Sequence, residues 1–404
     1  MIKNLLIKIL RKKYIKVLED NIESVNYSLE RCIIEKILKK VLTLFLFLVI
    51  IYSIGNNILY LSAYADLPSE INKVENCKNE KAVKKAISNS DNKNYNNNFD
   101  NQVNNTSIKN FHHIKKFNSD GVLIDSWGIK GIDKGELLHP HGIVSDSRGN
   151  IYVSDAIKCN IQMFDINGNF LLEFGTRGNG PGEFLQPESI ALDKNDNIFV
   201  VDYATHHIQK FDSNGNFITM WGSKGNGTNQ FMKPWGIGVD SKGYVYVGDQ
   251  ENPIIQKFDN DGNFIKKWGS FGSKAGQFVH IHDVTVDSKD DVYVTDGREN
   301  SRVEKFDSNG NFITMWGSKG SKEGQFIEDH GIAVDKQEKV YVVDTRNVRI
   351  QKFDSNGDFI MMWGSLGCKE NQFLVPHDIT IDPHNNIYVS DSGNVHFREN
   401  YACS

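Results

Sequence analysis

The sequence has few cysteines, which can cross-link a chain, and few prolines, which interrupt helices and strands. Of 404 residues, only 8 are Pro and 5 are Cys, and the cysteines stand far apart with no Cys-x-x-Cys pair. Scattered cysteines, odd in number and without a Cys/His cluster, exclude a disulfide framework and a zinc finger. No kinase or hydrolase signature appears either.

Excess positive charge is also lacking, because 46 Lys and Arg face 51 Asp and Glu. The charge is unevenly divided. Residues 1–110 carry 17 basic and 11 acidic residues, whereas residues 111–404 carry 29 and 40. A nucleic-acid-binding surface is basic because it neutralises phosphates. We therefore expect no nucleic acid among the partners of the acidic part.

The N-terminal segment has the pattern of a membrane anchor. Residues 2–18 predict a basic amphipathic helix within a cytoplasmic segment 1–40. Residues 41–65 begin with the apolar run Val41–Ile54 and are together long enough to span a bilayer. Lysines on their N-terminal side predict a single-pass signal anchor with the remaining chain extracytoplasmic. The predicted partner of residues 41–65 is therefore the membrane.

Other interpretations of this segment stay open. Ala63-Tyr64-Ala65 fits a signal-peptidase site, so secretion after cleavage near Ala65 is one alternative. A buried core helix is another. The following residues 66–110 are rich in Asn, Lys, Ser and Asp and lack apolar periodicity, which predicts a disordered stalk.

What the sequence has in abundance is one repeat. A Trp-Gly dipeptide, once Phe-Gly, recurs with spacings of 47, 47, 47, 48 and 47 residues, beginning at 127, 174, 221, 268, 316 and 363. Each unit contains four short apolar runs of period near 2, separated by Gly-containing turns, as in residues 233–270. Four antiparallel strands per repeat of this length are typical of a propeller blade.

The ends of the repeat array predict a closed ring of six blades over residues 111–404. The stretch 114–128 matches only the third and fourth strands of a unit, and residues 377–391 match only the first two. One sheet made from both half-blades leaves no free edge. The fold class is therefore all-β, a six-bladed propeller preceded by a helical membrane segment.

The repeat pattern resembles that of the NHL-repeat family of six-bladed propellers. In this sequence it runs as F..P.GI.VD..G.IYV.D..N.RIQKFD.NG.F...WG. The resemblance implies the fold but no single function, since binding platforms and enzymes share such scaffolds.

Several motifs that resemble sites recur in every unit, so we assign them structural roles. The Gly-rich segment 178–182 has equivalents between other blades and is not followed by a helix, so a phosphate loop is excluded. Asp-Asn-Asp-Gly-Asn at 259–263 is a hairpin turn and lacks the later Glu of a calcium loop. We likewise expect the six aromatic residues at the Trp-Gly position to pack between blades. The Asp that ends each second strand is expected to cap the following turn as an Asx cap.

Function is expected where equivalent positions differ between repeats. The residues just before the innermost strands should form one ring at the channel mouth, and imidazole and carboxylate are ligands for zinc. The candidate metal ligands in this ring are His141, Glu188, His282, His330 and His377, and Trp235 is the sixth position. Partly buried histidines bonded to backbone or water are the structural alternative.

The loops between second and third strands should open on the same face. A pocket with Arg and His suits an anionic or carboxylate ligand. The candidate ligand-binding residues there are Tyr203, His206, Gln250, Arg298 and Arg346. Arg302 and Arg349 recur within the repeat and are expected to be structural.

The ring also resembles that of peptidyl-α-hydroxyglycine amidating lyase, another six-bladed propeller. The resemblance lies in PHG at 140–142, PHD at 376–378, and segments 201–211 and 296–306. It implies zinc held by three alternate blades, which here carry Glu188, His282 and His377. It also implies a Tyr near 250–252, where this sequence has none.

Two functions follow as hypotheses. The first is a membrane-anchored propeller that binds a protein or small-molecule ligand at one face. The second is a metal-dependent lyase with a His/Glu zinc site at the channel mouth.

Overall fold

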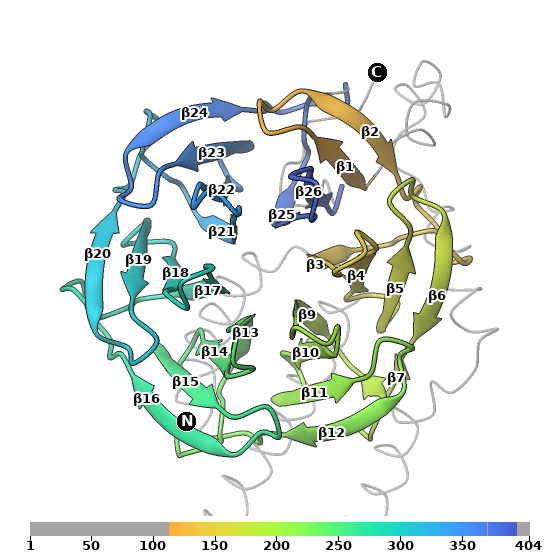
Figure 1. Ribbon diagram of the computed structural model, residues 1–404, viewed down its shortest axis with the longest axis horizontal. Coiled ribbons are helices and arrows are strands. Elements are labelled where there is room, and N and C mark those ends of the chain that lie inside the picture. Colours follow the sequence, from red (N-terminus) through yellow and green to blue (C-terminus); the bar gives the residue numbers. More distant parts are fainter. Residues whose placement is uncertain (1–112, 370, 394–404) are drawn as a thin grey trace, which may run out of the picture. The chain divides into compact units, whose positions relative to one another are not determined.

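The computed structural model describes residues 113–369 and 371–393, which form a six-bladed β-propeller (Figure 1). Six four-stranded antiparallel sheets surround a central channel, as the repeat count predicted. The predicted helix, membrane anchor and stalk lie outside the described residues. Within residues 113–369 and 371–393, no helix is long and apolar enough to cross a membrane.

Each sheet is one blade, and we number the blades 1 to 6 along the chain from β3. Blade 1 comprises β3 (Pro140–Ser145), β4 (Ile151–Asp155), β5 (Asn160–Phe164) and β6 (Phe170–Phe174). Blade 2 comprises β9 (Pro187–Leu192), β10 (Ile198–Asp202), β11 (His207–Phe211) and β12 (Phe217–Trp221). Blade 3 comprises β13 (Pro234–Val239), β14 (Val245–Asp249), β15 (Ile254–Phe258) and β16 (Phe264–Trp268).

The second half of the ring repeats the pattern. Blade 4 comprises β17 (Ile281–Val286), β18 (Val292–Asp296), β19 (Arg302–Phe306) and β20 (Phe312–Trp316). Blade 5 comprises β21 (Asp329–Val334), β22 (Val340–Asp344), β23 (Arg349–Phe353) and β24 (Phe359–Trp363). Blade 6 comprises β25 (Pro376–Ile381), β26 (Ile387–Asp391), β1 (Ile114–Phe117) and β2 (Leu123–Trp127). Two short strands, β7 (Thr176–Arg177) and β8 (Glu183–Phe184), pair in parallel in the crossover from blade 1 to blade 2.

Blade 6 closes the ring with strands from both ends of the propeller. Strand β1 pairs with β26 in antiparallel register, from Ile114 opposite Ser390 to Phe117 opposite Ile387. Ile114 and Phe117 are fully buried in this sheet. The predicted closure by two half-blades is therefore confirmed.

The sheets are held together by their buried faces. The second strand of every blade is buried along its whole length, whereas the outer strands are half-exposed. One core cluster joins Phe199 and Val201 of blade 2 to Val245 and Val247 of blade 3. Such clusters recur between blades, so each apolar face is covered by its neighbour.

The repeated Trp lies between blades, as predicted. Trp221 of blade 2 contacts Phe258 of blade 3, with ring centroids 5.9 Å apart. It also covers the turn of blade 3 at Gly262, where φ is +86° and an added Cβ would lie 2.6 Å from the indole. Glycine is needed at this turn both for the left-handed backbone and for the close approach.

The Asp that ends each second strand caps its loop, again as predicted. The carboxylate of Asp202 accepts hydrogen bonds from the amides of Ala204 and Thr205. It also accepts from Leu185 and Gln186, the end of the crossover that enters the blade. One carboxylate therefore fixes two loops at the same end of the blade.

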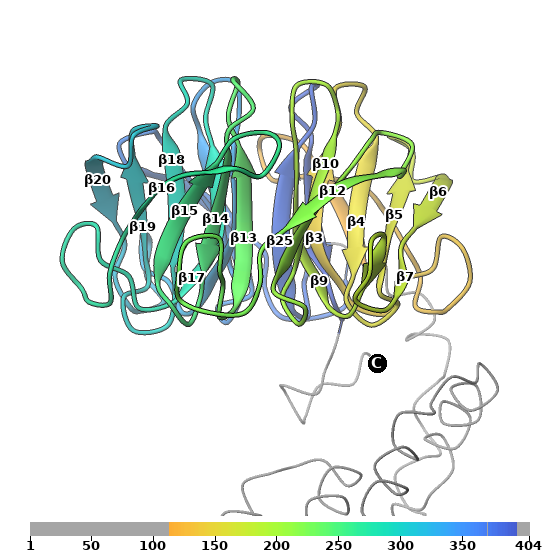
Figure 2. The ribbon, with the colours of Figure 1, turned by 90° about the horizontal axis from the view of Figure 1, so that it is seen from below.

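The ring has two distinct faces, seen edge-on in Figure 2. The crossover face carries the crossovers between blades and the loops from second to third strands. The hairpin face carries the turns from first to second strands, such as residues 240–244, and from third to fourth strands. The channel runs between these faces along the six innermost strands.

Candidate metal and ligand site

The ring residues lie inside the innermost strands rather than just before them. His141 is the second residue of β3, because pairing already begins at Pro140, which lies opposite Asp155. The pairing register then shifts between Pro140 and Ile143. This irregularity places His141 and Gly142 both on the channel wall, since both line the cavity there.

The six ring side chains fill the channel near the crossover face. Neighbouring aromatic rings contact one another, with centroid distances from 4.0 Å for His141–His377 to 6.1 Å for Trp235–His282. They enclose a cavity of only about 20 Å³. This is space for about one water molecule.

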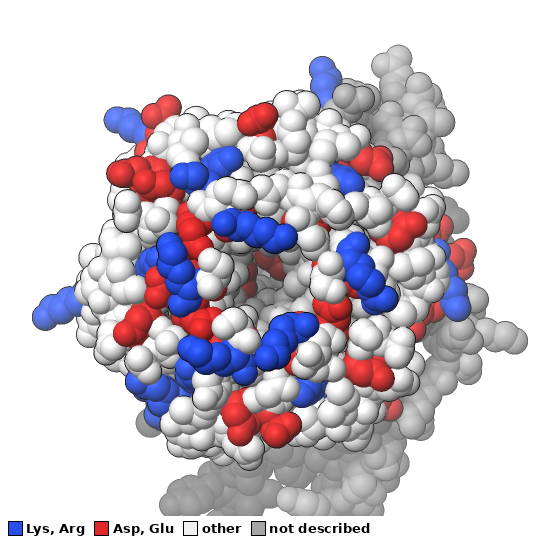
Figure 3. Space-filling view, viewed as in Figure 1, with Lys and Arg blue, Asp and Glu red and all other residues white. Residues whose placement is uncertain are grey.

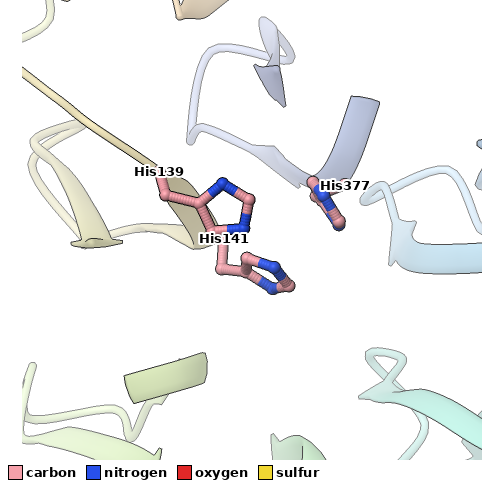
Figure 4. Close-up of side chains that lie close together, drawn as sticks. All are labelled: His139, His141 and His377. Carbon is pink, nitrogen blue, oxygen red and sulfur yellow. The ribbon is translucent and has the colours of Figure 1, made fainter. Parts of the chain in front are cut away.

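One side of the ring forms a cluster of three histidines (Figure 4). His139, His141 and His377 each offer a ring nitrogen within 4.8 Å of the other two. We call this group the blade-1/6 trio. His139 was not predicted. It precedes the ring residue by two positions, a spacing that places both side chains on one face of an extended strand.

Glu188 orients the blade-1/6 trio instead of joining it. Its carboxylate contacts Nδ1 of His141, and its other oxygen accepts a 2.6 Å hydrogen bond from Gln186. A carboxylate on one imidazole nitrogen fixes the ring and leaves Nε2 for a ligand. Glu188 therefore positions His141, a candidate metal ligand, through Nδ1 of that imidazole.

A second cluster lies on blades 4 and 5. His282, Glu328 and His330 also place their ligand atoms within 4.8 Å of one another, and we call them the blade-4/5 trio. Nδ1 of His282 lies 2.7 Å from the carbonyl oxygen of Asp329, which directs Nε2 away from the backbone. Glu328 was not predicted, although it too precedes a ring histidine by two positions.

The two trios combine candidate ligands from different blades than the resemblance to the amidating lyase implied. The resemblance to the amidating lyase implied alternate blades, with Glu188, His282 and His377 as one ligand set. The ligand atoms that lie within 4.8 Å of one another come from neighbouring blades, and the alternate-blade set stays a prediction. His282 and His377 belong to different trios, and Trp235 separates His141 from His282 on one side of the ring.

Burial favours the neutral form of four imidazoles of the site, those of His139, His282, His330 and His377. Burial lowers the pKa of His139 and His330 to about 3. The pKa values of His282 and His377 lie well below the usual value, for the same reason and because other histidines are close. A neutral imidazole offers a lone pair, which is the form that binds a metal ion.

Several of these nitrogens have no partner within the described protein. Nδ1 of His139, His280 and His377 is buried and makes no hydrogen bond with any described residue. A buried polar atom left unpaired costs on the order of 1–3 kcal/mol. A metal ion or a bound polar ligand would satisfy the two that belong to the blade-1/6 trio.

The second-to-third-strand loops open beside the ring, and three predicted ligand-binding residues reach it. Tyr203 packs edge-on against Trp235, with ring centroids 5.3 Å apart. Arg346 forms an ion pair with Glu328 of the blade-4/5 trio. Arg298 is close enough to His280 and His282 for its charge to lower the pKa of both.

The other two predicted residues are placed differently. Gln250 is buried, and its backbone amide donates to the carbonyl of Lys233. His206 adopts φ +64°. None of the five predicted ligand-binding residues lines the ring cavity itself. Lys233, which was not predicted, lies beside Tyr203: its Nζ is 5.4 Å from the centre of the Tyr203 ring and 2.9 Å from Glu251.

Arg302 and Arg349 are structural, as expected. Arg302 donates to the carbonyls of Ser273, Lys274 and Gln277 in the crossover that enters its blade. Arg349 makes the equivalent bonds in blade 5. Both side chains are therefore committed to loop carbonyls.

A constriction lies directly below the ring. The next position along the innermost strands is Gly in blades 1, 3 and 5, and is Ser189, Asp283 and Asp378 in blades 2, 4 and 6. Asp283 accepts the amide of Ile332 at 3.0 Å, and Asp378 accepts that of Ile143 at 2.9 Å. Each carboxylate thus joins its blade to the next. Burial raises the pKa of Asp283 to about 6 and that of Asp378 well above its usual value.

Comparison with protein families agrees with the fold. A family model described as a 6-bladed beta-propeller matches residues 136–212, and the NHL-repeat model matches residues 278–306 and 330–353. No curated protein matches the chain significantly.

Solved structures share the fold at low sequence identity. A structural-genomics protein of unknown function from Bacteroides thetaiotaomicron has a TM-score of 0.52 and 16% identity, over 69% of this chain and 76% of that one. Virginiamycin B lyase from Staphylococcus aureus has a TM-score of 0.46 and 12% identity, over 69% and 81%. A gluconolactonase from Xanthomonas campestris has a TM-score of 0.47 and 11% identity, over 64% and 87%. At 16% identity, the similarity to the Bacteroides thetaiotaomicron protein shows the fold alone.

Proposed function

We propose that this propeller of NHL repeats is a binding protein whose crossover face holds a small polar ligand through a divalent metal ion. The observation that carries the proposal is the convergence of histidine side chains into two trios at one channel mouth. Isolated buried histidines are common, but ring nitrogens of three histidines within 4.8 Å of one another are not required by the repeat.

The residues present fit a zinc ion or a similar metal. Imidazole and carboxylate are its usual ligands, and each trio brings three such groups within 4.8 Å of one another. Glu188 and the Asp329 carbonyl hold the rings of His141 and His282 from behind, as outer groups do in metal sites. A bound metal would act as a Lewis acid toward an oxygen of the ligand.

Groups around the mouth select the ligand. Arg298 and Lys233 supply positive charge beside the ring, and the Tyr203 hydroxyl hydrogen-bonds with Lys233. Guanidinium and ammonium groups beside a metal favour a carboxylate or another small anion. Arg346 already pairs with Glu328 and would compete with a metal ion for its carboxylate, so we expect the blade-1/6 trio to bind the metal more readily.

Metal analysis of the purified full-length protein tests the proposal. We expect stoichiometric zinc, lost in a His139→Ala/His377→Ala double variant and retained in His384→Ala, an exposed histidine of the hairpin face. A His282→Ala/Glu328→Gln variant reports on the blade-4/5 trio separately. Absence of bound metal, together with melting that zinc and chelators leave unchanged, would overturn the proposal.

A metal-dependent lyase is the second candidate. It is favoured by a phenol and two cations at the channel mouth: Tyr203 packs against Trp235 and contacts Lys233, and Arg298 lies near His280 and His282. Incubation with a peptidyl-α-hydroxyglycine, followed by mass spectrometry, tests this reaction. Cleavage that disappears in Tyr203→Phe while bound metal is retained would support it, and an unchanged peptide would leave binding as the function.

We also propose that residues 41–65 anchor the protein in a membrane with the propeller extracytoplasmic. Their apolar length and the lysines before them support this topology. Cell fractionation should find the full-length chain in membranes and resistant to alkaline carbonate. A soluble protein beginning at Asp66 would instead show cleavage and secretion.

A further inference from the structure

The two ends of the channel are separate compartments. The ring and the constriction fill the channel near the crossover face, where only about 20 Å³ stays open. Across the constriction, Ser189 and Asp283 lie within 3.4 Å of each other. A ligand bound at the hairpin face therefore cannot reach the trios without moving core strands.

The hairpin-face end opens into a much larger cavity of about 420 Å³. This volume is in the range of small-molecule sites. Its apolar floor is built by four blades, with Leu192, Val239, Val334 and Ile381 at equivalent positions near the ends of their innermost strands. Figure 3 views this face and shows the hollow at its centre, with Lys and Arg side chains around it.

The acidic residues of the cavity wall are already committed. The turn that follows each innermost strand begins with an Asp, and in blade 5 this is Asp335. One oxygen of Asp335 accepts the amides of Gln337 and Lys339, and the other accepts the hydroxyl of Tyr341. On the rim, Asp196 binds Ser147 through both oxygens. These carboxylates stabilise turns and have little capacity left for a ligand.

Most basic residues of the rim are committed too, with two exceptions. Arg148 pairs with Asp146, Lys242 with Asp290 at 3.0 Å, and Lys289 with Glu338 at 3.5 Å. Lys194 and Lys336 line the cavity, and neither forms an ion pair with a described residue, although Nζ of Lys336 donates a 3.1 Å hydrogen bond to the carbonyl oxygen of Pro383. They belong to blades 2 and 5, on opposite sides of the six-blade ring.

We propose that this cavity is a second ligand site, which takes a compact amphipathic anion. An apolar chain or ring would lie on the floor of Leu192, Val239, Val334 and Ile381. Its carboxylate or other anionic group would meet Lys194 or Lys336 at the rim. Apolar burial supplies the affinity, and the ammonium groups of Lys194 and Lys336, which have no carboxylate partner among the described residues, supply the positive charge that favours an anion.

Octanoate binding to the full-length protein, measured by isothermal titration calorimetry, tests this site. We expect saturable binding with a negative heat-capacity change, the mark of apolar burial. A Lys194→Ala/Lys336→Ala variant should bind octanoate about tenfold more weakly. Val239→Trp, which fills the floor, should abolish binding, and its melting temperature is the control for folding.

Lys242→Ala is the matched control, because Lys242 is a rim cation already paired with Asp290, and it should leave octanoate binding unchanged. The His139→Ala/His377→Ala variant should do the same, which keeps this site distinct from the metal site. No saturable octanoate binding would overturn the proposal. Octylammonium binding as tightly as octanoate would also overturn it, because the site would then not select anions.

Discussion

Residue 304 shows how one substitution within a repeat changes the chemistry of a buried position. Four blades carry Gln there, and each Gln both accepts a crossover amide and donates to a crossover carbonyl, as Gln351 does with Gly324 and Gln325. Blade 4 carries Glu304, which accepts the amide of Gly276 and a side-chain bond from Arg302. Burial raises the pKa of Glu304 to about 7.

This position makes stability depend on pH. Because the pKa of Glu304 in the folded protein lies above its ordinary value of about 4.5, the folded state binds the extra proton between these two pH values. The free energy of unfolding should therefore fall as pH rises from about 4.5 to about 7. Glu304→Gln should remove this component and stabilise the protein at pH 8 by on the order of 2 kcal/mol.

Urea unfolding of both proteins at pH 5 and pH 8 measures the effect. Gln351→Glu is the matched control, since it places a carboxylate at the same position of blade 5 beside Arg349. That variant should acquire an added loss of stability at the higher pH. Equal pH profiles for the parent and Glu304→Gln would contradict the prediction.

Only some residues of the candidate site could be predicted from the sequence. The ring histidines were predictable, because they stand at one repeat position that no strand or turn requires. His139 and Glu328 lie two positions earlier and could have been found by extending the same alternation. That Glu188 turns to His141, and that the ring divides into two trios, depended on side-chain distances that a linear sequence does not contain.

The innermost strands are the most crowded elements of the propeller. An added Cβ at Gly142 would lie 2.4 Å from the carbonyl oxygen of Glu188 in the neighbouring strand, a contact that only backbone movement relieves. The three glycines of the constriction thus set how closely β3, β13 and β21 approach their neighbours. The alternation of these glycines with Ser189, Asp283 and Asp378 could not be interpreted from the sequence, because only the closed ring brings the six positions together.

Gly142→Ala should therefore destabilise the propeller by about 3 kcal/mol or more through overpacking. Thermal unfolding followed by circular dichroism measures this. Gly180→Ala in a crossover is the matched control, because its added Cβ meets only the flexible end of Glu183. If the two variants melted at the same temperature, the crowding of the innermost strands would be less than described.

At the scale of the whole molecule, the repeat period and the two half-repeats were enough to predict the architecture. Strand number, blade number and closure all follow from a 47-residue pattern, since each unit must cover its apolar face with the next. The cavity at the hairpin face was not predictable in the same way. Its floor uses the ordinary apolar positions of the repeat, and only the ring geometry makes them face one another.

Closure itself has a measurable energy. Phe117 of β1 is fully buried and packs against Trp363 and Phe373, at centroid distances of 5.9 and 5.7 Å. Phe117→Ala should cost about 3–5 kcal/mol. Amide exchange should rise in β25 and β26 as well as in β1, because all three belong to the closing sheet.

Phe217→Ala, at a partly exposed position of β12, is the control and should cost less than about 1 kcal/mol. Faster exchange confined to β1 would show that the sheet opens strand by strand. Faster exchange throughout blade 6 would show that the ring opens as a unit.

The shared sheet of blade 6 also imposes an order in time. Strand β2 ends at Trp127 and its sheet is completed only when β25 and β26, Pro376–Asp391, have been made. At typical synthesis rates the intervening chain takes roughly 10–50 s to emerge. Throughout that interval β1 has no partner on one side, so a newly made chain depends on being kept from other strands until its own last two arrive.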